Sequence, residues 1–309
     1  MGSIAASSTD GAELSEDRLL ARFDELVESG AVVYNRNYRS VRLVDQGFSF
    51  DFRILSSLAT KPSAHSAGPP NCRPGSDIDV TGFEVCNLGP PGGAATHLLA
   101  ANKFPAARPH FLILTQDGWR RQHEPLDADD FAAMRQVLEA VMRNPSPSSS
   151  ARRYLAFFNC GFASGCSRVH KHMQIVPVQG GERGYGEENF PLWPDAEDPK
   201  PPFKFAMARF QAGLPPVREL VSVYRGLLKE AELAVGECEK RQEGEALPHN
   251  LILDDRWMVV VPRQAPGWEG ADTNAMGMLG MVWLHSEERR QIWVEKGPTE
   301  VLKKLGYPA

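Results

Sequence analysis

Residues 169–177, VHKHMQIVP, place two histidines and a glutamine at alternate positions of one short segment. Valine and isoleucine are enriched in β-strands, and alternate side chains of a strand face the same side. We therefore expect a strand over residues 169–178 with His170, His172 and Gln174 on one face. The opposite face would carry Lys171, Met173 and Ile175. The first face could present two imidazoles and an amide to a single polar ligand.

A turn of small residues precedes this strand. The segment 159–168, NCGFASGCSR, contains two glycines and two serines, and it follows an apolar segment, 152–160, that predicts a partner strand. Glycine lets backbone N–H groups approach an anion closely, and such turns form anion-binding concavities. We expect this turn to hold a negatively charged group, with Asn159 at the end of the entering strand.

Three interpretations of the His-x-His pattern compete. The pair could bind zinc, but no carboxylate or thiol lies nearby at the spacing of a third ligand. The two histidines could instead be structural, bonded to backbone carbonyls within a sheet. In the third interpretation one histidine attacks a phosphorus atom while the strand and the turn hold the phosphates. The small-residue turn favours the third interpretation.

The rest of the sequence predicts short strands in adjacent pairs. Apolar residues at helical spacing predict helices over 14–30, 127–142 and 217–242, and a helical segment over 286–306 broken at 297–298. Further strands are expected over 31–34, 48–54, 97–101, 110–115, 249–255 and 256–263. Adjacent strands with few intervening helices favour an α+β fold, a mainly antiparallel sheet flanked by helices, over a doubly wound parallel sheet.

The composition limits the kind of protein. The 309 residues are 42% hydrophobic and 24% charged, which allows a buried core. A net charge of −5 argues against binding to nucleic acid or membranes, so local groups must hold any polyphosphate. Five cysteines without a CxxC pair predict reduced thiols, and no signal peptide or membrane-spanning run is evident. We expect a cytoplasmic protein, with the nucleus left open.

The expected organisation is a single domain. A flexible polar tail over 1–14 would precede one domain over 15–309. Stretches rich in proline and serine predict a long loop at 56–76 and a linker at 143–151. We expect a monomer or a small homo-oligomer.

The segment 159–177, NCGFASGCSRVHKHMQIVP, resembles the active-site segment of the histidine-triad superfamily, in the branch where glutamine replaces the third histidine. That branch contains galactose-1-phosphate uridylyltransferases and the diadenosine tetraphosphate phosphorylases, or ATP adenylyltransferases. The second family fits better, because its other segments resemble 97–115, HLLAANKFPAARPHFLILT, 249–263, HNLILDDRWMVVVPR, and 274–284, NAMGMLGMVWL, in the same order. The resemblance implies a fold like that of galactose-1-phosphate uridylyltransferase.

The resemblance also implies a role for each matching residue. His172 would be the nucleophile, Gln174 would bond non-bridging phosphate oxygens, and His170 would orient the site. The residues implied to hold phosphates are Lys61, Asn159, Gly165, Cys166, Ser167 and Arg168. Those implied to contact the nucleotide are Asn102, Lys103, Asn274, Ala275, Met276 and Met281. Some of these also have simpler interpretations: Lys103 could be a solvated loop lysine, and the two methionines could be core residues.

The implied reaction is phosphorolysis of diadenosine tetraphosphate to ATP and ADP through a covalent adenylyl-histidine. Adenylyl sulfate plus phosphate would be a side reaction through the same intermediate. No protein metal site and no organic cofactor are implied, but a divalent cation such as Mg²⁺ would accompany the polyphosphate, held mainly by its oxygens. The partners would be small molecules, namely a dinucleoside polyphosphate, phosphate, ADP and ATP, without nucleic acid or membrane.

Two positions depart from the family pattern. Arg168 stands where the family usually has glutamine, and His285 where it usually has lysine at a phosphate contact. These departures concern substrate preference more than the class of reaction. Two alternatives stay open at this point: another nucleotidyltransferase of the same superfamily, and a nucleotide-binding sensor with reduced turnover.

Overall fold

The computed structural model describes residues 14–35, 37–60, 72–143, 153–179, 190–196, 201–236 and 244–309. The helices are α1 (Glu16–Glu28), α2 (Ala128–Arg143), α3 (Val217–Val235), α4 (Ala275–Met278), α5 (Glu287–Lys296) and α6 (Pro298–Leu305). The strands are β1 (Arg39–Asp45), β2 (Phe48–Ile54), β3 (Glu84–Leu88), β4 (His97–Ala101), β5 (Phe111–Thr115), β6 (Arg153–Cys160), β7 (His172–Gln179), β8 (Ala206–Arg209), β9 (His249–Leu253), β10 (Trp257–Pro262), β11 (Gly267–Trp268), β12 (Ala271–Asp272) and β13 (Met281–Leu284).

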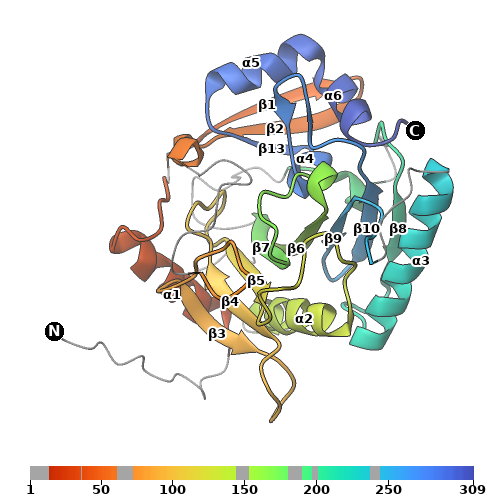
Figure 1. Ribbon diagram of the computed structural model, residues 1–309. Coiled ribbons are helices and arrows are strands. Elements are labelled where there is room, and N and C mark those ends of the chain that lie inside the picture. The colour runs from red at the N-terminus through yellow and green to blue at the C-terminus, as the bar shows by residue number, and fades with distance from the viewer. Residues whose placement is uncertain are drawn as a thin grey trace.

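One large antiparallel sheet organises the molecule (Figure 1). Its strands follow the order β3-β4-β5-β7-β6-β9-β10-β8, and every neighbouring pair is antiparallel. The pairing of β6 with β9 joins the N-terminal strands to the C-terminal ones. The expected α+β fold, with a mainly antiparallel sheet flanked by helices, is confirmed.

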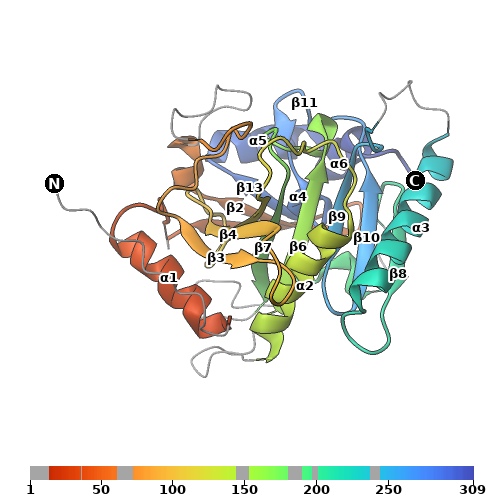
Figure 2. The ribbon, with the colours of Figure 1, turned by 60° about the horizontal axis from the view of Figure 1, so that its bottom comes forward.

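The two faces of the large sheet are covered by different elements. Ala156 and Phe158 of β6 face a core that includes residues of α1, α2 and α3. Leu155 and Phe157 face a second core, built with a small sheet and the C-terminal helices. In the small sheet β2 lies between β1 and β13, and β13 runs parallel to β2. Figure 2 shows α1, α2 and α3 together on one side of the large sheet.

Most of the expected elements are confirmed to within a few residues, but one expected strand is wrong. Residues 31–34 form no strand, because the chain folds back onto the end of α1, where the Val32 N–H donates to the Leu26 carbonyl at 2.9 Å. The sequence did not predict β1, β3, β8 or β13, nor the short elements β11, β12 and α4. β1 is an edge strand with no fully buried residue, so it lacks a clear apolar alternation.

Several expected features lie wholly or mainly outside the described residues. These are the N-terminal tail, much of the loop at 56–76, the linker at 143–151 and the end of the helix expected to reach residue 242. The structure describes that helix as α3, which ends at Val235. The single-domain boundaries stay a prediction. In the described part of the chain, no helix is long and apolar enough to cross a membrane.

The strand that carries His172 begins later than expected. β7 starts at His172, and His170 lies before it in an isolated bridge to Arg121. The His170 ring is buried between Ser76 Oγ, 2.8 Å from Nδ1, and Thr115 Oγ1, 2.9 Å from Nε2. The expectation that both imidazoles face one ligand from a strand is therefore wrong, because these two hydroxyl groups hold the His170 ring elsewhere.

Lys171 lies on the opposite side from His172, as predicted. Its Nζ is 2.6 Å from Asp130 Oδ2 of α2 and 2.7 Å from the Pro125 carbonyl oxygen. The other carboxylate oxygen of Asp130 lies 3.0 Å from His97 Nε2. Lys171 and Asp130 are both fully buried, so this ion pair joins the start of β7 to the helix behind the sheet.

Candidate active site

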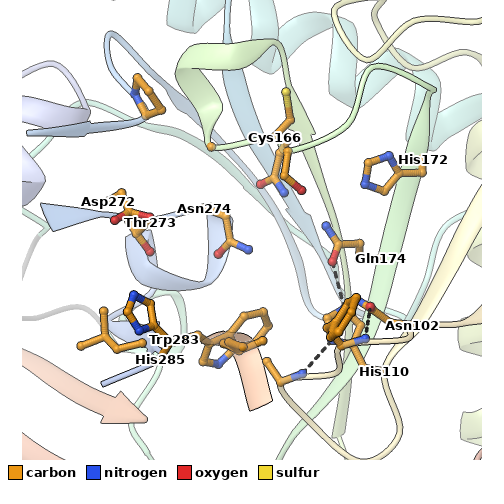
Figure 3. Close-up of a pocket in the computed structure, with 18 of the residues that line it drawn as sticks. Asn102, His110, Cys166, His172, Gln174, Asp272, Thr273, Asn274, Trp283 and His285 are labelled. Carbon is orange, nitrogen blue, oxygen red and sulfur yellow. Dashed lines mark hydrogen bonds between the residues drawn. The ribbon is translucent and has the colours of Figure 1, made fainter. Parts of the chain in front are cut away.

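A pocket of about 340 Å³ lies between the large sheet and β13 of the small sheet. His172 and Gln174 of β7 line one side of it. Figure 3 shows these two residues facing Thr273, Asn274 and His285 across the pocket. Because β13 belongs to the C-terminal part of the chain, distant segments of sequence form the two walls.

The backbone fixes the tautomer of His172. Its Nδ1 lies 2.8 Å from the carbonyl oxygen of His170. A carbonyl oxygen can only accept a hydrogen bond, so Nδ1 carries the hydrogen. In the neutral ring the lone pair is then on Nε2, and His172 lines the pocket. This is the tautomer that can attack an electrophile through Nε2.

Strands β6 and β7 separate beside His172, and the side chain of Gln122 fills the gap. Their backbone pairing ends at Phe157 and Gln174. Beyond that pair the Gln122 Oε1 accepts from the His172 N–H at 2.8 Å, and its Nε2 donates to the His172 and Asn159 carbonyls at 3.0 Å. The buried amide thus replaces the missing strand-to-strand bonds where the pocket opens.

His110 fixes the orientation of the Gln174 amide. The Ala106 N–H, which can only donate, lies 3.2 Å from His110 Nδ1. In the neutral ring the hydrogen is therefore on Nε2, which donates to Gln174 Oε1 at 2.9 Å. Asn102 Nδ2, 3.2 Å from the same Nε2, is also a donor and cannot accept it. The Trp283 ring, centred 5.7 Å away, packs on the His110 ring.

Four amide side chains line the pocket, those of Asn102, Asn159, Gln174 and Asn274. In each of them the oxygen is already occupied by a donor, which is His110 in the case of Gln174. The other donors are backbone N–H groups. Phe104 donates to the side-chain oxygen of Asn102, Ala275 to that of Asn159 and Met276 to that of Asn274, each at 3.0 Å. Phosphate oxygens accept hydrogen bonds, so the uncharged NH2 groups of these amides could hold an anion. Such local donors are needed because the protein as a whole has a net charge of −5 and does not attract anions.

Gly165 brings the small-residue turn against the opposite wall. It has a φ of +82°, which favours glycine, and a Cβ atom there would lie 2.4 Å from the Thr273 carbonyl oxygen. Any side chain would therefore push Gly165 away from Thr273. Both residues line the pocket, so this contact sets its width on that side.

A small charged group forms one end of the pocket. Arg289 Nε lies 3.3 Å from His285 Nε2, and Arg289 Nη1 lies 2.7 Å from the Gly270 carbonyl oxygen and 3.9 Å from Asp272 Oδ1. An arginine can only donate, so His285 accepts through Nε2. Among the described residues that line the pocket, Arg289 carries the permanent positive charge and Asp272 the carboxylate.

The structure brings together most of the residues proposed from the sequence. Those that line the pocket are His172, Gln174, Asn102, Asn159, Gly165, Cys166, Ser167, Asn274 and His285. Those described elsewhere are His170, Lys103, Arg168, Ala275, Met276 and Met281. Lys61 lies outside the described residues. Ala275 and Met276 nevertheless orient pocket amides through their backbone N–H groups.

Three of the other residues have identifiable surroundings, although they do not line the pocket themselves. The Lys103 Nζ lies 5.8 Å from the centre of the Phe104 ring, a cation–π contact. Met281 is buried in the core beneath β13. The charge of Arg168 acts on the Cys72 thiol, where it opposes burial and the charges of Asp79 and Asp77, which raise the pKa of that thiol.

Sequence reasoning missed His110, Gln122 and Arg289. The sequence did contain a signal for His110. It lies two residues before Leu112 in the predicted strand over 110–115, so alternation places the two side chains on the same face. Arg289 follows His285 by four residues in a segment predicted to be helical, the spacing at which side chains meet. Nothing local marks Gln122, because its partners lie 37 and 50 residues away along the chain.

Side chains that commonly bind metal ions are not clustered in the described part of the chain. No group of three or more His, Cys, Asp or Glu side chains among them could hold a metal ion. Asp272 is the carboxylate that lines the described part of the pocket, and its side chain is 72% exposed. A hard cation that needs six oxygen ligands would have to obtain most of them from a ligand or water.

Two family models together match nearly the whole chain. Residues 16–194 match the Ap4A phosphorylase N-terminal domain, where Ap4A is diadenosine tetraphosphate, and residues 199–308 match the ATP adenylyltransferase C-terminal domain. The chain belongs to the Ap4A phosphorylase family. The family resemblance seen in the sequence is therefore confirmed.

Two yeast proteins are similar to this chain. Diadenosine 5',5'''-P1,P4-tetraphosphate phosphorylase 2 of Saccharomyces cerevisiae is 28% identical over 277 residues, covering 82% of each protein. Protein APA1 of the same yeast is 26% identical over 235 residues, covering 70% of this chain and 71% of that protein.

Solved structures of a yeast Ap4A phosphorylase have the same fold. Apa2 in complex with Ap4A superposes with a TM-score of 0.74 at 22% identity, covering 96% of this chain and 98% of that one. Apa2 in complex with AMP gives a TM-score of 0.70 at 21% identity, with 96% and 97% coverage.

Proposed function

We propose that this chain cleaves diadenosine tetraphosphate with inorganic phosphate, forming ATP and ADP through an adenylyl group carried on His172. The observation that carries the proposal is the tautomer of His172, whose Nδ1–H bonds the backbone while Nε2 holds the lone pair in a pocket of amide donors. The reaction needs a nucleophile for phosphorus and preorganised donors for phosphate oxygens. Membership of the Ap4A phosphorylase family supports the same activity.

In the first half-reaction His172 Nε2 attacks the α-phosphorus. A P–N bond forms while the bond from that phosphorus to the bridging oxygen breaks, and ATP leaves with the bonding electron pair. The Nδ1–H keeps its bond to the His170 carbonyl, which helps to stabilise the positive charge that develops on the ring. Gln174 and Asn159 would donate to the non-bridging oxygens in the transition state.

In the second half-reaction an oxygen of hydrogen phosphate attacks the same phosphorus. A P–O bond forms, the P–N bond breaks, and its electron pair returns to Nε2 of His172. ADP leaves, and the proton of hydrogen phosphate passes to solvent. Glutamine cannot shuttle protons as histidine can, so Gln174 favours transfer to phosphate, already an anion, over activation of water.

Mg²⁺ would enter with the substrate rather than sit in a site of the protein. Polyphosphate oxygens and water would supply its ligands, consistent with the few carboxylates of the pocket. Adenylyl sulfate would react by the same route, because its α-phosphorus carries the same adenylyl group. The partners are thus nucleotides and phosphate, and we propose a cytoplasmic monomer or small homo-oligomer.

A phosphate-dependence assay tests this proposal. The purified protein is mixed with diadenosine tetraphosphate and Mg²⁺, with and without phosphate, and ATP is measured by luciferase. We expect ATP in many-fold excess over the protein, with an equal amount of ADP, only when phosphate is present; without phosphate no more than one ATP per protein molecule should form. Parallel reactions with diuridine tetraphosphate and with UDP-sugars test for uridylyl transfer. Tight nucleotide binding without turnover would instead identify a sensor.

A further inference from the structure

Arg263 is a buried cation behind the pocket. It follows β10, its side chain does not line the pocket, and the residue is 1% exposed. Its guanidinium donates only to uncharged oxygens. They are the carbonyls of Ser164, Ala265, Thr273 and Leu305 and the side-chain Oδ1 of Asn250, at 2.6–3.3 Å.

The charge of Arg263 has no counter-ion among the described residues. No carboxylate is bonded to the guanidinium, and no charged side chain contributes to the shift of its pKa, which burial lowers to about 9. The group therefore stays positive at neutral pH. Proteins rarely bury a cation without an anion, because the lost hydration is not recovered from uncharged partners.

The position of Arg263 suggests what compensates this charge. Nη1 holds the Ser164 carbonyl, next to Gly165 in one wall, and Nη2 holds the Thr273 carbonyl in the other wall. Gly165 and Thr273 line the pocket and contact each other. The positive charge thus lies directly behind the place where two walls meet and where amide donors face the ligand.

The network around Arg263 continues into the pocket. Asn250, which accepts from the guanidinium at 2.6 Å, donates in turn to Asn159 Oδ1 and to the Ser164 carbonyl, both at 2.9 Å. Asn159 lines the pocket, and because its Oδ1 already accepts from Asn250 and Ala275, its NH2 group is the part left to bond a ligand. A chain of oriented dipoles therefore connects the buried charge with a phosphate donor.

We propose that Arg263 is a positioning residue whose uncompensated charge is the internal counter-charge for the phosphates of the bound nucleotide. It joins the two walls by hydrogen bonds, and its field acts on the ligand through a part of the protein that excludes water. This proposal rests on the proposed function, because it assumes that the pocket binds phosphates. Arg263 would thus supply part of the attraction for phosphate without contacting the ligand.

Titration with a series of ligands tests the charge of Arg263 separately from its structural hydrogen bonds. Arg263→Lys keeps the charge and Arg263→Gln removes it, while both lose part of the hydrogen bonding. Arg209→Gln, which removes an exposed cation on β8, is the matched control. Adenosine, AMP, ADP and ATP are titrated into each variant by calorimetry at one salt concentration. Circular dichroism and thermal unfolding show whether each variant is folded.

We expect the loss in Arg263→Gln to grow with each phosphate, from within about twofold for adenosine to at least about tenfold for ATP. Arg263→Lys and Arg209→Gln should keep the wild-type ratio of ATP to adenosine affinity to within about threefold. An equal loss for all four ligands, or no loss, would overturn the proposal. The proposal would also be overturned if Arg263→Gln failed to fold, whether or not Arg263→Lys folds, because the residue would then be needed for the stability of the fold. A wild type that binds no nucleotide would contradict the proposed function itself, and with it this proposal.

Discussion

The Nδ1 atom of His172 lies 2.8 Å from the carbonyl oxygen of His170. The two histidines of the HKH segment are thus connected through the backbone of one and the ring of the other. The His170 ring is held between the hydroxyls of Ser76 and Thr115, and burial lowers its pKa, which keeps it neutral. His170 therefore contacts the His172 ring through its carbonyl group, whose position the two hydroxyls stabilise.

The bond from His110 to Gln174 predicts coupling between these two side chains. Gln174→Ala should lower kcat by roughly a hundredfold, because it removes a donor to the transferred phosphate. His110→Ala should lower kcat by about tenfold, because the Gln174 amide can then turn over. When Gln174→Ala is already present, the further change His110→Ala should lower kcat by less than about twofold. The measurement is kcat and KM for all four proteins.

Full additivity of the two losses would contradict this role of His110. A purely structural role would lower the unfolding temperature of His110→Ala with and without Gln174, and kcat losses would multiply. Thermal unfolding of the four proteins is therefore the control.

The charge of Arg289 at the pocket end predicts an effect on substrate binding. Arg289→Gln should raise KM for diadenosine tetraphosphate by at least about tenfold and change kcat little, since charge-assisted bonds to phosphate are worth about 1.5–3 kcal/mol. Arg290→Gln is the control, because Arg290 lies next in α5, bonds Glu287 and does not line the pocket. Equal KM values for both variants would exclude Arg289 as a phosphate contact.

The buried Lys171–Asp130 pair predicts acid sensitivity of the fold. Burial alone would raise the pKa of Asp130, but the bond from His97 and the charge of Lys171 outweigh it and lower the pKa to about 2, from the usual 3.8. A depressed carboxyl pKa stabilises the fold above pH 3.8 and loses that contribution as pH falls to 2. The free energy of unfolding should therefore fall by roughly 2 kcal/mol between pH 5 and pH 2 from this group alone.

Substitution of Lys171 isolates that group. Lys171→Met leaves Asp130 buried without its cation and should lower the free energy of unfolding at pH 7 by about 3–5 kcal/mol. Lys171→Met with Asp130→Asn should recover part of this loss, because no buried carboxylate remains. Urea unfolding from pH 2 to pH 7 measures both effects. A Lys171→Met variant with the same free energy of unfolding as the wild type would contradict the stabilising role of the Lys171–Asp130 pair.

The local pattern around His172 was sufficient to predict the centre of the site. Alternation placed His172 and Gln174 on one face, and the glycines and serines before them predicted the turn that lines the pocket. The role of the His170 ring was not predictable, because its partners Ser76 and Thr115 lie 94 and 55 residues away along the chain. Pairwise contacts of this kind depend on the folded sheet and leave no local pattern.

The fold, too, could be predicted only where a local sequence pattern specifies it. Buried strands such as β4 and β10 have continuous apolar residues and were predicted, whereas β1 is partly exposed at the edge of the small sheet and was missed. The wall opposite His172 includes β13 and its neighbours, more than 100 residues later in the chain. Their meeting depends on the parallel pairing of β13 with β2, which no short pattern specifies.

Mass spectrometry can detect the proposed adenylyl group on His172 itself. The protein is mixed with diadenosine tetraphosphate without phosphate, quenched at alkaline pH, digested and weighed. We predict an added AMP on the peptide that contains His172, lost when phosphate is added before the quench and absent in His172→Gly. Substrate binding without any AMP adduct, or an adduct that persists in His172→Gly, would contradict the account.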